Sequence, residues 1–258
     1  MFTSSINPIL FSIGPLDIRY YGLFYVIGFI FSYFLFSYLA KERKIKMKQS
    51  EVADFFVYII IGSIAGARLF YAIIYNPMHY IHNLLDLFAV WKGGMSFHGG
   101  LVGGVLAAYI FIRKKKLDFY EIADIAVIPL VAARGLGRIG NFINGELYGR
   151  ITNVWWSVKF PTAEGFRHPS QLYEAFKNLL IFNVLFFIRN IKLPKGTIFW
   201  LFVFLTGAFR FIIEFFREPD PQLGFIIGWL TMGQILSILM VIASAIFLTK
   251  LIYISKTH

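Results

Sequence analysis

The chain has 258 residues, of which 58% are hydrophobic and 15% are charged, and its mean hydropathy is +0.67. Soluble domains usually carry about 25% charged residues, so this composition excludes an ordinary soluble protein and predicts an all-α integral membrane protein. The sequence contains no cysteine, which excludes disulfides, thiolate metal sites and a cysteine nucleophile. The net charge of +11 raises the question of a nucleic-acid partner, which the placement of the charges answers below.

Seven apolar stretches follow one another along the chain, and about 20 apolar residues suffice for a helix to cross a membrane. The first twenty residues, interrupted by Pro8 and Pro15, lack the charged start and continuous apolar core of a signal peptide. We therefore expect about seven transmembrane helices in a single domain over residues 1–258. The stretches are Tyr21–Ala40, Ala53–Tyr75, Gly94–Ile112, Tyr120–Ile139, Phe176–Ile188, Thr197–Phe216 and Phe225–Ile254.

Lysine and arginine gather after the first, third and fifth stretches, in residues 41–48, 113–116 and 189–195. Short loops rich in these residues stay in the cytoplasm. This pattern predicts an external N-terminus, a cytoplasmic C-terminus and, at about residues 141–175, an external subdomain with Trp155 and Trp156 as interfacial anchors. The net charge is then explained by topology and by anionic lipids, and no nucleic-acid partner is predicted.

Charged residues inside the apolar stretches recur at helical spacing. Arg134, Arg138 and Asn141 share one helical face, and the predicted topology places them near the same outer depth as His98. Ionisable residues inside a membrane are costly and usually functional.

A second such face carries Arg210, Glu214 and Arg217. We expect Glu214 to pair with Arg210, which leaves Arg134, Arg138 and Arg217 without acidic partners inside the bundle. Because guanidinium groups bind phosphate through paired hydrogen bonds, the pattern predicts an anionic ligand.

Three further features have simpler explanations. Arg68 either joins the site or anchors a neighbouring helix, and the sequence leaves both open. The segment Gly135–Gly140 matches G-x-G-x-x-G but follows a membrane span instead of a strand, so we reject a dinucleotide site. Small-residue spacing predicts close helix packing at Gly62, Gly66, Gly99, Gly100, Gly103 and Gly104.

Taken together, five motifs resemble the bacterial phosphatidylglycerol–prolipoprotein diacylglyceryl transferases. The motifs cover nearly the whole chain, and the third is the most specific. They are Tyr20–Gly22, Gly93–Leu101, Gly135–Gly149, His168–Glu174 and Arg210–Asp220.

The resemblance implies transfer of a diacylglyceryl group from phosphatidylglycerol to the lipobox cysteine of a prolipoprotein in the bacterial inner membrane. No acidic cluster suggests a metal site, and we predict neither a metal nor a cofactor. The resemblance also implies that Tyr21, His98, Arg138, Asn141, Glu146, Gly149 and Arg210 match important family positions. One departure is Thr206, where the family often has a tyrosine, so we assign that position no catalytic role.

The residues themselves fit this chemistry. His98 is a candidate general base for the substrate thiol, and Arg138 and Arg210 are candidates for stabilising the leaving phosphate. We predict catalytic roles for these three and Tyr21, and binding roles for Arg138, Asn141, Asn144, Glu146, Gly149, Arg210 and Arg217. A transporter of anionic solutes or lipids and a structural scaffold remain alternatives, although the repeated halves typical of many transporters are not evident.

Overall fold

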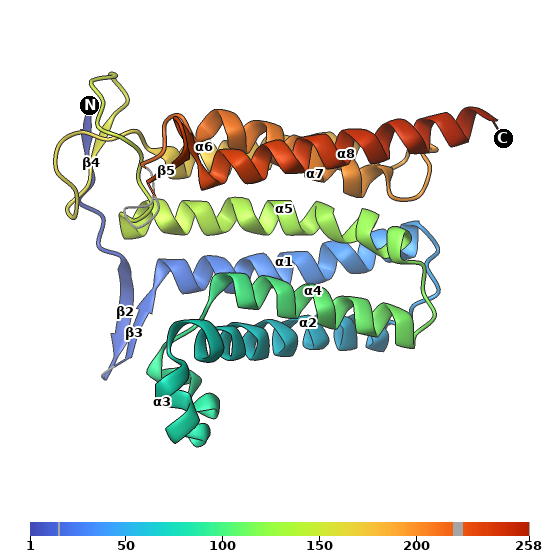
Figure 1. Ribbon diagram of the computed structural model, residues 1–258, viewed down its shortest axis with the longest axis horizontal. Coiled ribbons are helices and arrows are strands. Elements are labelled where there is room, and N and C mark those ends of the chain that lie inside the picture. The colour runs from blue at the N-terminus through green and yellow to red at the C-terminus, as the bar shows by residue number, and fades with distance from the viewer. Residues whose placement is uncertain (15, 219–223, 258) are drawn as a thin grey trace. The chain divides into compact units, whose positions relative to one another are not determined.

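The computed structural model describes residues 1–14, 16–218 and 224–257, and most of them are helical (Figure 1). Pro15, Pro219 and Asp220, which took part in the sequence argument, lie outside the described residues. The chain divides into two compact units. The first, the split unit, contains residues 1–36 and 123–258; the second, the hairpin unit, contains residues 37–122.

Every predicted apolar stretch contains a helix. Over the part of the chain that is described, four segments are long and apolar enough to cross a membrane: Tyr20–Glu42, Gln49–Tyr75, Ser170–Ile188 and Met232–Tyr253. Thr197–Ile213 is apolar but shorter. The helices are α1 (Tyr20–Glu42), α2 (Gln49–Phe70, continued by the π-helix Tyr71–Tyr75), α4 (Phe97–Lys114), α5 (Phe119–Asn144), α6 (Ser170–Ile188), α7 (Thr197–Ile213) and α8 (Met232–Thr257).

Short strands accompany the helices, so the all-α prediction was incomplete. Strand β1 (Phe2–Thr3) pairs in parallel with β4 (Val158–Lys159), and β2 (Ile9–Ile13) pairs antiparallel with β3 (Leu16–Arg19). The hairpin of β5 (Phe225–Ile227) and β6 (Leu230–Thr231) occupies the predicted start of the last helix.

The prediction that this last helix begins at Phe225 was wrong, because the helix begins at Met232. Gly228 has a φ of +56° at the hairpin turn. Only glycine adopts this conformation without steric cost.

In the hairpin unit, α2 and α4 pack side by side through glycine (Figure 1). A Cβ atom added at Gly62, Gly66, Gly99 or Gly103 would collide with the facing backbone. The predicted close packing is therefore confirmed, with the two helices in backbone contact. Along the chain, the segment that connects α2 to α4 contains α3 (Pro77–His82) and the 3₁₀ turns Leu84–Phe88 and Val90–Lys92.

In the split unit, α5 packs against α1, where a Cβ at Gly28 would lie 3.2 Å from that of Ala133. The carboxylate of Asp124 on α5 accepts hydrogen bonds of 2.8 Å from the backbone N–H groups of Gly196 and Phe199. This carboxylate caps the N-terminus of α7, because those N–H groups have no partner within the helix.

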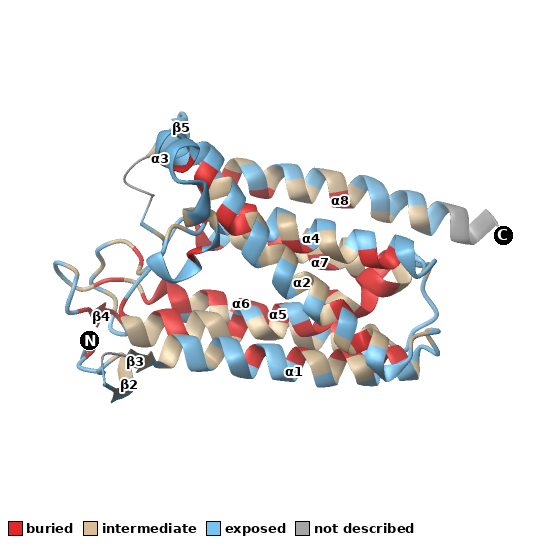
Figure 2. Ribbon diagram, turned by 90° about the horizontal axis from the view of Figure 1, so that it is seen from below, coloured by how far each residue is buried: buried red, intermediate tan, exposed pale blue. Residues whose placement is uncertain are grey.

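Much of the surface of α1 and α8 is exposed (Figure 2). On α8, side chains such as Leu236, Leu239 and Ile246 are among the exposed apolar groups. Apolar surface of this kind on a helix suits contact with lipid.

Candidate active site

The centre of the polar network in the split unit is Glu174 on α6. Its carboxylate accepts hydrogen bonds from Lys177 Nζ at 2.5 Å and from Arg210 on α7 at 2.7 Å, and Nε of Arg138 on α5 lies 3.9 Å away. Glu174 is 3% exposed and Lys177 is 2% exposed. A carboxylate buried this deeply requires compensating charge. Glu174 therefore joins three helices through one group.

The sequence analysis missed Glu174 and Lys177, and the expectation that Arg138 lacks an acidic partner was wrong. The fifth apolar stretch was predicted to begin at Phe176, whereas α6 begins at Ser170. The extra turns bring the Glu174 carboxylate inside the bundle. The i, i+3 spacing of Glu174 and Lys177 was the signal available in the sequence.

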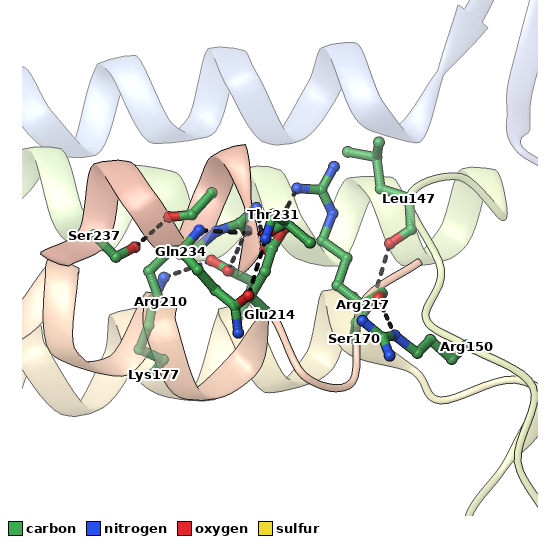
Figure 3. A network of polar contacts seen from close by, with 12 residues as sticks. Leu147, Arg150, Ser170, Lys177, Arg210, Glu214, Arg217, Thr231, Gln234 and Ser237 are labelled. Carbon is green, nitrogen blue, oxygen red and sulfur yellow. Dashed lines mark hydrogen bonds and ion pairs between the residues drawn. The ribbon is translucent and has the colours of Figure 1, made fainter. Parts of the chain in front are cut away.

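Arg210 also contacts a second carboxylate, as expected. Its other terminal nitrogen lies 2.7 Å from Glu214 (Figure 3). The guanidinium is therefore held between Glu174 and Glu214. Arg217 lies 3.9 Å from Glu214, which corrects the expectation that Arg217 lacks an acidic partner.

Glu214 is fixed in turn by the start of α8. The hydroxyl of Thr231 donates to Glu214 at 3.1 Å, and a Cβ at Gly233 would lie 2.8 Å from the carboxyl carbon. Glycine at position 233 thus leaves room for the carboxylate. A negative charge beside a helix N-terminus is stabilised by the helix dipole.

The end of α5 carries the predicted amide and carboxylate groups together. Arg138 donates to the side-chain oxygen of Asn141 at 3.3 Å, and Asn141 donates to Glu146 at 2.9 Å. Asn144 also donates to Glu146, at 3.4 Å. Gln171 donates to the backbone oxygen of Glu146 at 2.7 Å, which fixes this loop to α6.

Gly149 lies where two backbone segments meet. Its N–H donates to the carbonyl of His168 at 2.8 Å, and a Cβ would lie 2.9 Å from the same oxygen. The next residue, Arg150, donates through Nε to the carbonyl of Arg217 at 2.9 Å (Figure 3). Gly149 thus allows the loop to pack beside Arg217.

Tyr21 lies at the start of α1, on the face that packs against α5. A Cβ at Gly140 would lie 3.1 Å from the Cα of Tyr21, and the Tyr21 hydroxyl donates to that of Tyr25 at 2.9 Å. The side chain lies within electrostatic range of Glu146 and Arg138. Tyr21 therefore belongs to the same neighbourhood as the α5 residues.

His98 is in the hairpin unit, in the first turn of α4, and is exposed. Ser96 caps this helix by accepting from the N–H of Gly99 at 3.3 Å, and its own N–H donates to Ala67 at 3.0 Å. The start of α4 is thus fixed to α2 immediately before His98.

Arg68 is held by backbone carbonyls of the same unit, which supports the anchoring role among the two that the sequence left open. Its side chain is almost fully buried and lies over the ring of Tyr80. The accepting carbonyls are those of Asp86 at 2.5 Å, Leu87 at 3.2 Å, Ala89 at 2.9 Å, Gly94 at 3.1 Å, and Gly93.

The segment Gly135–Gly140, which matches the dinucleotide fingerprint literally, lies inside α5. A dinucleotide site requires a turn between a strand and a helix. The segment therefore lacks the strand–turn–helix geometry of such a site.

Comparison with known proteins gives one consistent family. A family model described as prolipoprotein diacylglyceryl transferase matches residues 8–250. Proteins named phosphatidylglycerol–prolipoprotein diacylglyceryl transferase are 48% identical in Geobacter sulfurreducens, over 90% of each chain, and 46% identical in Rickettsia rickettsii, over 92% of this chain and 94% of that protein. This chain belongs to the prolipoprotein diacylglyceryl transferase family.

Proposed function

We propose that this protein transfers the diacylglyceryl group of phosphatidylglycerol to the lipobox cysteine thiol of a prolipoprotein signal peptide. The names of its relatives supply both substrate classes. The observation that supports this function best is the pair of arginines held on one carboxylate, Arg138 and Arg210 on Glu174. Two guanidinium groups from different helices, oriented by a shared anion, are suited to binding a phosphate between them.

The proposed reaction forms a thioether and releases glycerol phosphate. The thiol sulfur attacks the glyceryl carbon that carries the phosphate, the new carbon–sulfur bond forms, and the carbon–oxygen bond to phosphate breaks. Negative charge grows on the leaving phosphate, and Arg138 and Arg210 stabilise it there. Asn141, Asn144 and Glu146 bind the glycerol head group beside Arg138, with Tyr21, Gly149 and Arg217 lining the same site.

His98 is the proposed acceptor of the thiol proton. A free thiol has a pKa of about 8.5 and reacts as the thiolate, so a base raises the reactive fraction at neutral pH. His98→Asn should slow transfer strongly at neutral pH and recover in part at higher pH. Nearly normal transfer at neutral pH would remove His98 from this role.

The proposed topology has seven transmembrane spans in the bacterial inner membrane, with an external N-terminus and the site facing the outer leaflet. Together the spans form a single membrane domain, with residues 141–175 as an external subdomain. The sequence contains no cysteine, so each introduced cysteine is a unique label. Cysteines at Lys46, Lys115 and Lys195 should react only from the cytoplasm, and one at Glu164 only from outside. Cytoplasmic labelling at Glu164 would contradict the topology.

The direct test of the activity is mass spectrometry of a lipobox peptide incubated with purified protein and phosphatidylglycerol. The peptide should gain one diacylglyceryl group on its cysteine, and glycerol phosphate should appear in equal amount. A peptide with serine in place of cysteine is the control. A transporter would move the lipid without changing the peptide, so an unmodified peptide would favour that alternative.

A further inference from the structure

One face of α5 changes in polarity along its length. Leu130, Arg134, Arg138 and Asn141 follow at i, i+4, i+8 and i+11, so they lie on the same side of the helix. Leu130 is 48% exposed, Arg134 is exposed, and Asn141 is buried against Glu146. The face therefore runs from an apolar residue through two cations to an amide.

Arg134 differs from the other arginines within the helices in its contacts. Arg68, Arg138 and Arg210 each donate to an oxygen of the protein. For Arg134, residues 1–14, 16–218 and 224–257 provide neither a hydrogen bond nor an ion pair. The charge of Glu174 acts on it at longer range. Its five N–H donors thus remain available to a ligand on this face of α5.

We infer that Arg134 binds the ester carbonyls of the diacylglyceryl group and makes the enzyme selective for ester-linked lipid. This inference rests on the proposed function, in which Arg138 binds the phosphate. Arg134 lies one turn further from the outer end of α5, a rise of about 6 Å. In phosphatidylglycerol, the ester groups lie one glycerol unit from the phosphate, on the side of the acyl chains.

The order of groups along the lipid then matches the order along the helix. The acyl chain lies beside Leu130, the esters beside Arg134, the phosphate beside Arg138, and the glycerol head group beside Asn141. Phosphatidylglycerol carries a single phosphate, so a second cation one turn deeper meets neutral acceptors. The charge of Glu174 favours the cation at Arg134, whereas the charges of Arg138 and Arg210 oppose it.

The experiment compares two lipids that differ only at the esters. Transfer to a lipobox peptide is measured with diester phosphatidylglycerol and with its diether analogue, which lacks the carbonyl oxygens. In the unmodified enzyme, kcat/KM for the diester should exceed that for the diether by about 10- to 100-fold, the range for hydrogen bonds from a charged donor. Arg134→Met should slow the diester reaction and leave the diether reaction nearly unchanged, so the ratio should fall at least tenfold.

Arg113→Met is the matched control, because it removes an exposed arginine from the last turn of α4. It should keep the full diester preference. If Arg134→Met does not purify as a folded protein, Arg134→Gln, which keeps one amide donor group, should give an intermediate ratio.

Three results would overturn the inference. An unchanged ratio in Arg134→Met would exclude contact with the esters. An equal loss with both lipids would assign Arg134 to packing or to general electrostatics. Weaker inhibition by added glycerol phosphate, with the ratio unchanged, would identify a second anion site instead. Failure of the proposed function is a separate outcome, because the unmodified enzyme would then modify the peptide with neither lipid.

Discussion

The two units of this protein join their helices in opposite ways. In the hairpin unit, α2 and α4 meet through glycines, and their backbones touch where side chains would collide. In the split unit, α5, α6 and α7 meet through Glu174, Arg138 and Arg210. Lipid provides little hydrophobic drive for helices to associate, so close packing and polar contacts replace it.

This difference between glycine contacts and charged contacts indicates which unit has side-chain donors available to bind a substrate. A helix contact made by glycine involves no side-chain donor, so it leaves no donor available for a ligand. A charged contact between helices leaves part of each guanidinium available, because five donors exceed the acceptors that a single carboxylate provides. In this protein, the ionic groups that link the helices of the split unit are also the groups proposed to bind phosphate. Substitutions at Glu174 and Arg138 distinguish holding the helices together from binding phosphate.

The largest expected effect comes from removing the shared carboxylate. Glu174→Gln leaves Lys177 buried without its counter-ion and should lower the free energy of unfolding by about 3–5 kcal/mol. Lys177→Met should cost much less, because Glu174 still contacts Arg210 and Arg138. Thermal unfolding in detergent micelles measures both variants. Equal losses of stability in the two variants would show that Lys177 contributes as much to the stability of the network as Glu174 does.

Next is the phosphate contact itself. Arg138→Lys keeps the charge but loses the planar fork, so transfer should fall by about 100- to 1000-fold while the protein still inserts and purifies. Arg134→Lys, one turn away on the same face, should have a smaller effect. Transfer and phosphatidylglycerol binding are measured for both. Full transfer activity in the Arg138→Lys variant would indicate that Arg210 and Arg217, and not Arg138, bind the phosphate.

A smaller effect is expected from packing in the hairpin unit. A Cβ at Gly103 would collide with the backbone of Gly62, whereas a Cβ at Gly100 would make ordinary contacts of 3.4 Å. Gly103→Ala should therefore cost about 1–3 kcal/mol of stability through overpacking, and Gly100→Ala should cost little. Hydrogen exchange of α2 and α4 amides measures this difference. Equal protection in the two variants would contradict the close approach of the helices.

The smallest effect concerns His168, in the loop before α6. Burial lowers the pKa of His168 below its usual 6.5. The unfolded chain then binds more protons than the folded one between the two pKa values, so stability should be complete above pH 6.5 and should decrease as the pH falls below it. His168→Gln should reduce this slope. A pH titration of thermal stability, with the unmodified protein as reference, tests the sign.

Much of the fold follows from hydropathy, because each apolar stretch became a helix. Hydropathy failed at Phe225, where a glycine turn interrupts an apolar segment, and at Ser170, where polar side chains begin a helix. The arginine face of α5 was predicted from spacing within a single helix. The prediction that Arg217 shares a helical face with Arg210 and Glu214 was wrong, because α7 ends at Ile213 and Arg217 forms a β-bridge with Gly149. The contact of Arg210 with Glu174 was not predicted, since that contact depends on how α6 and α7 align in three dimensions.

The split between the units also sets an order for biogenesis. Residues 37–122 are synthesised as one continuous segment, whereas residues 1–36 can contact α5 only after α5 has been made. Formation of the ion pairs is delayed in the same way, because Arg138 is synthesised before Glu174, and Glu174 before Arg210. Since domains assemble as their parts emerge, closing the ionic cluster is among the last events of synthesis, and the site can form only once the chain is nearly complete.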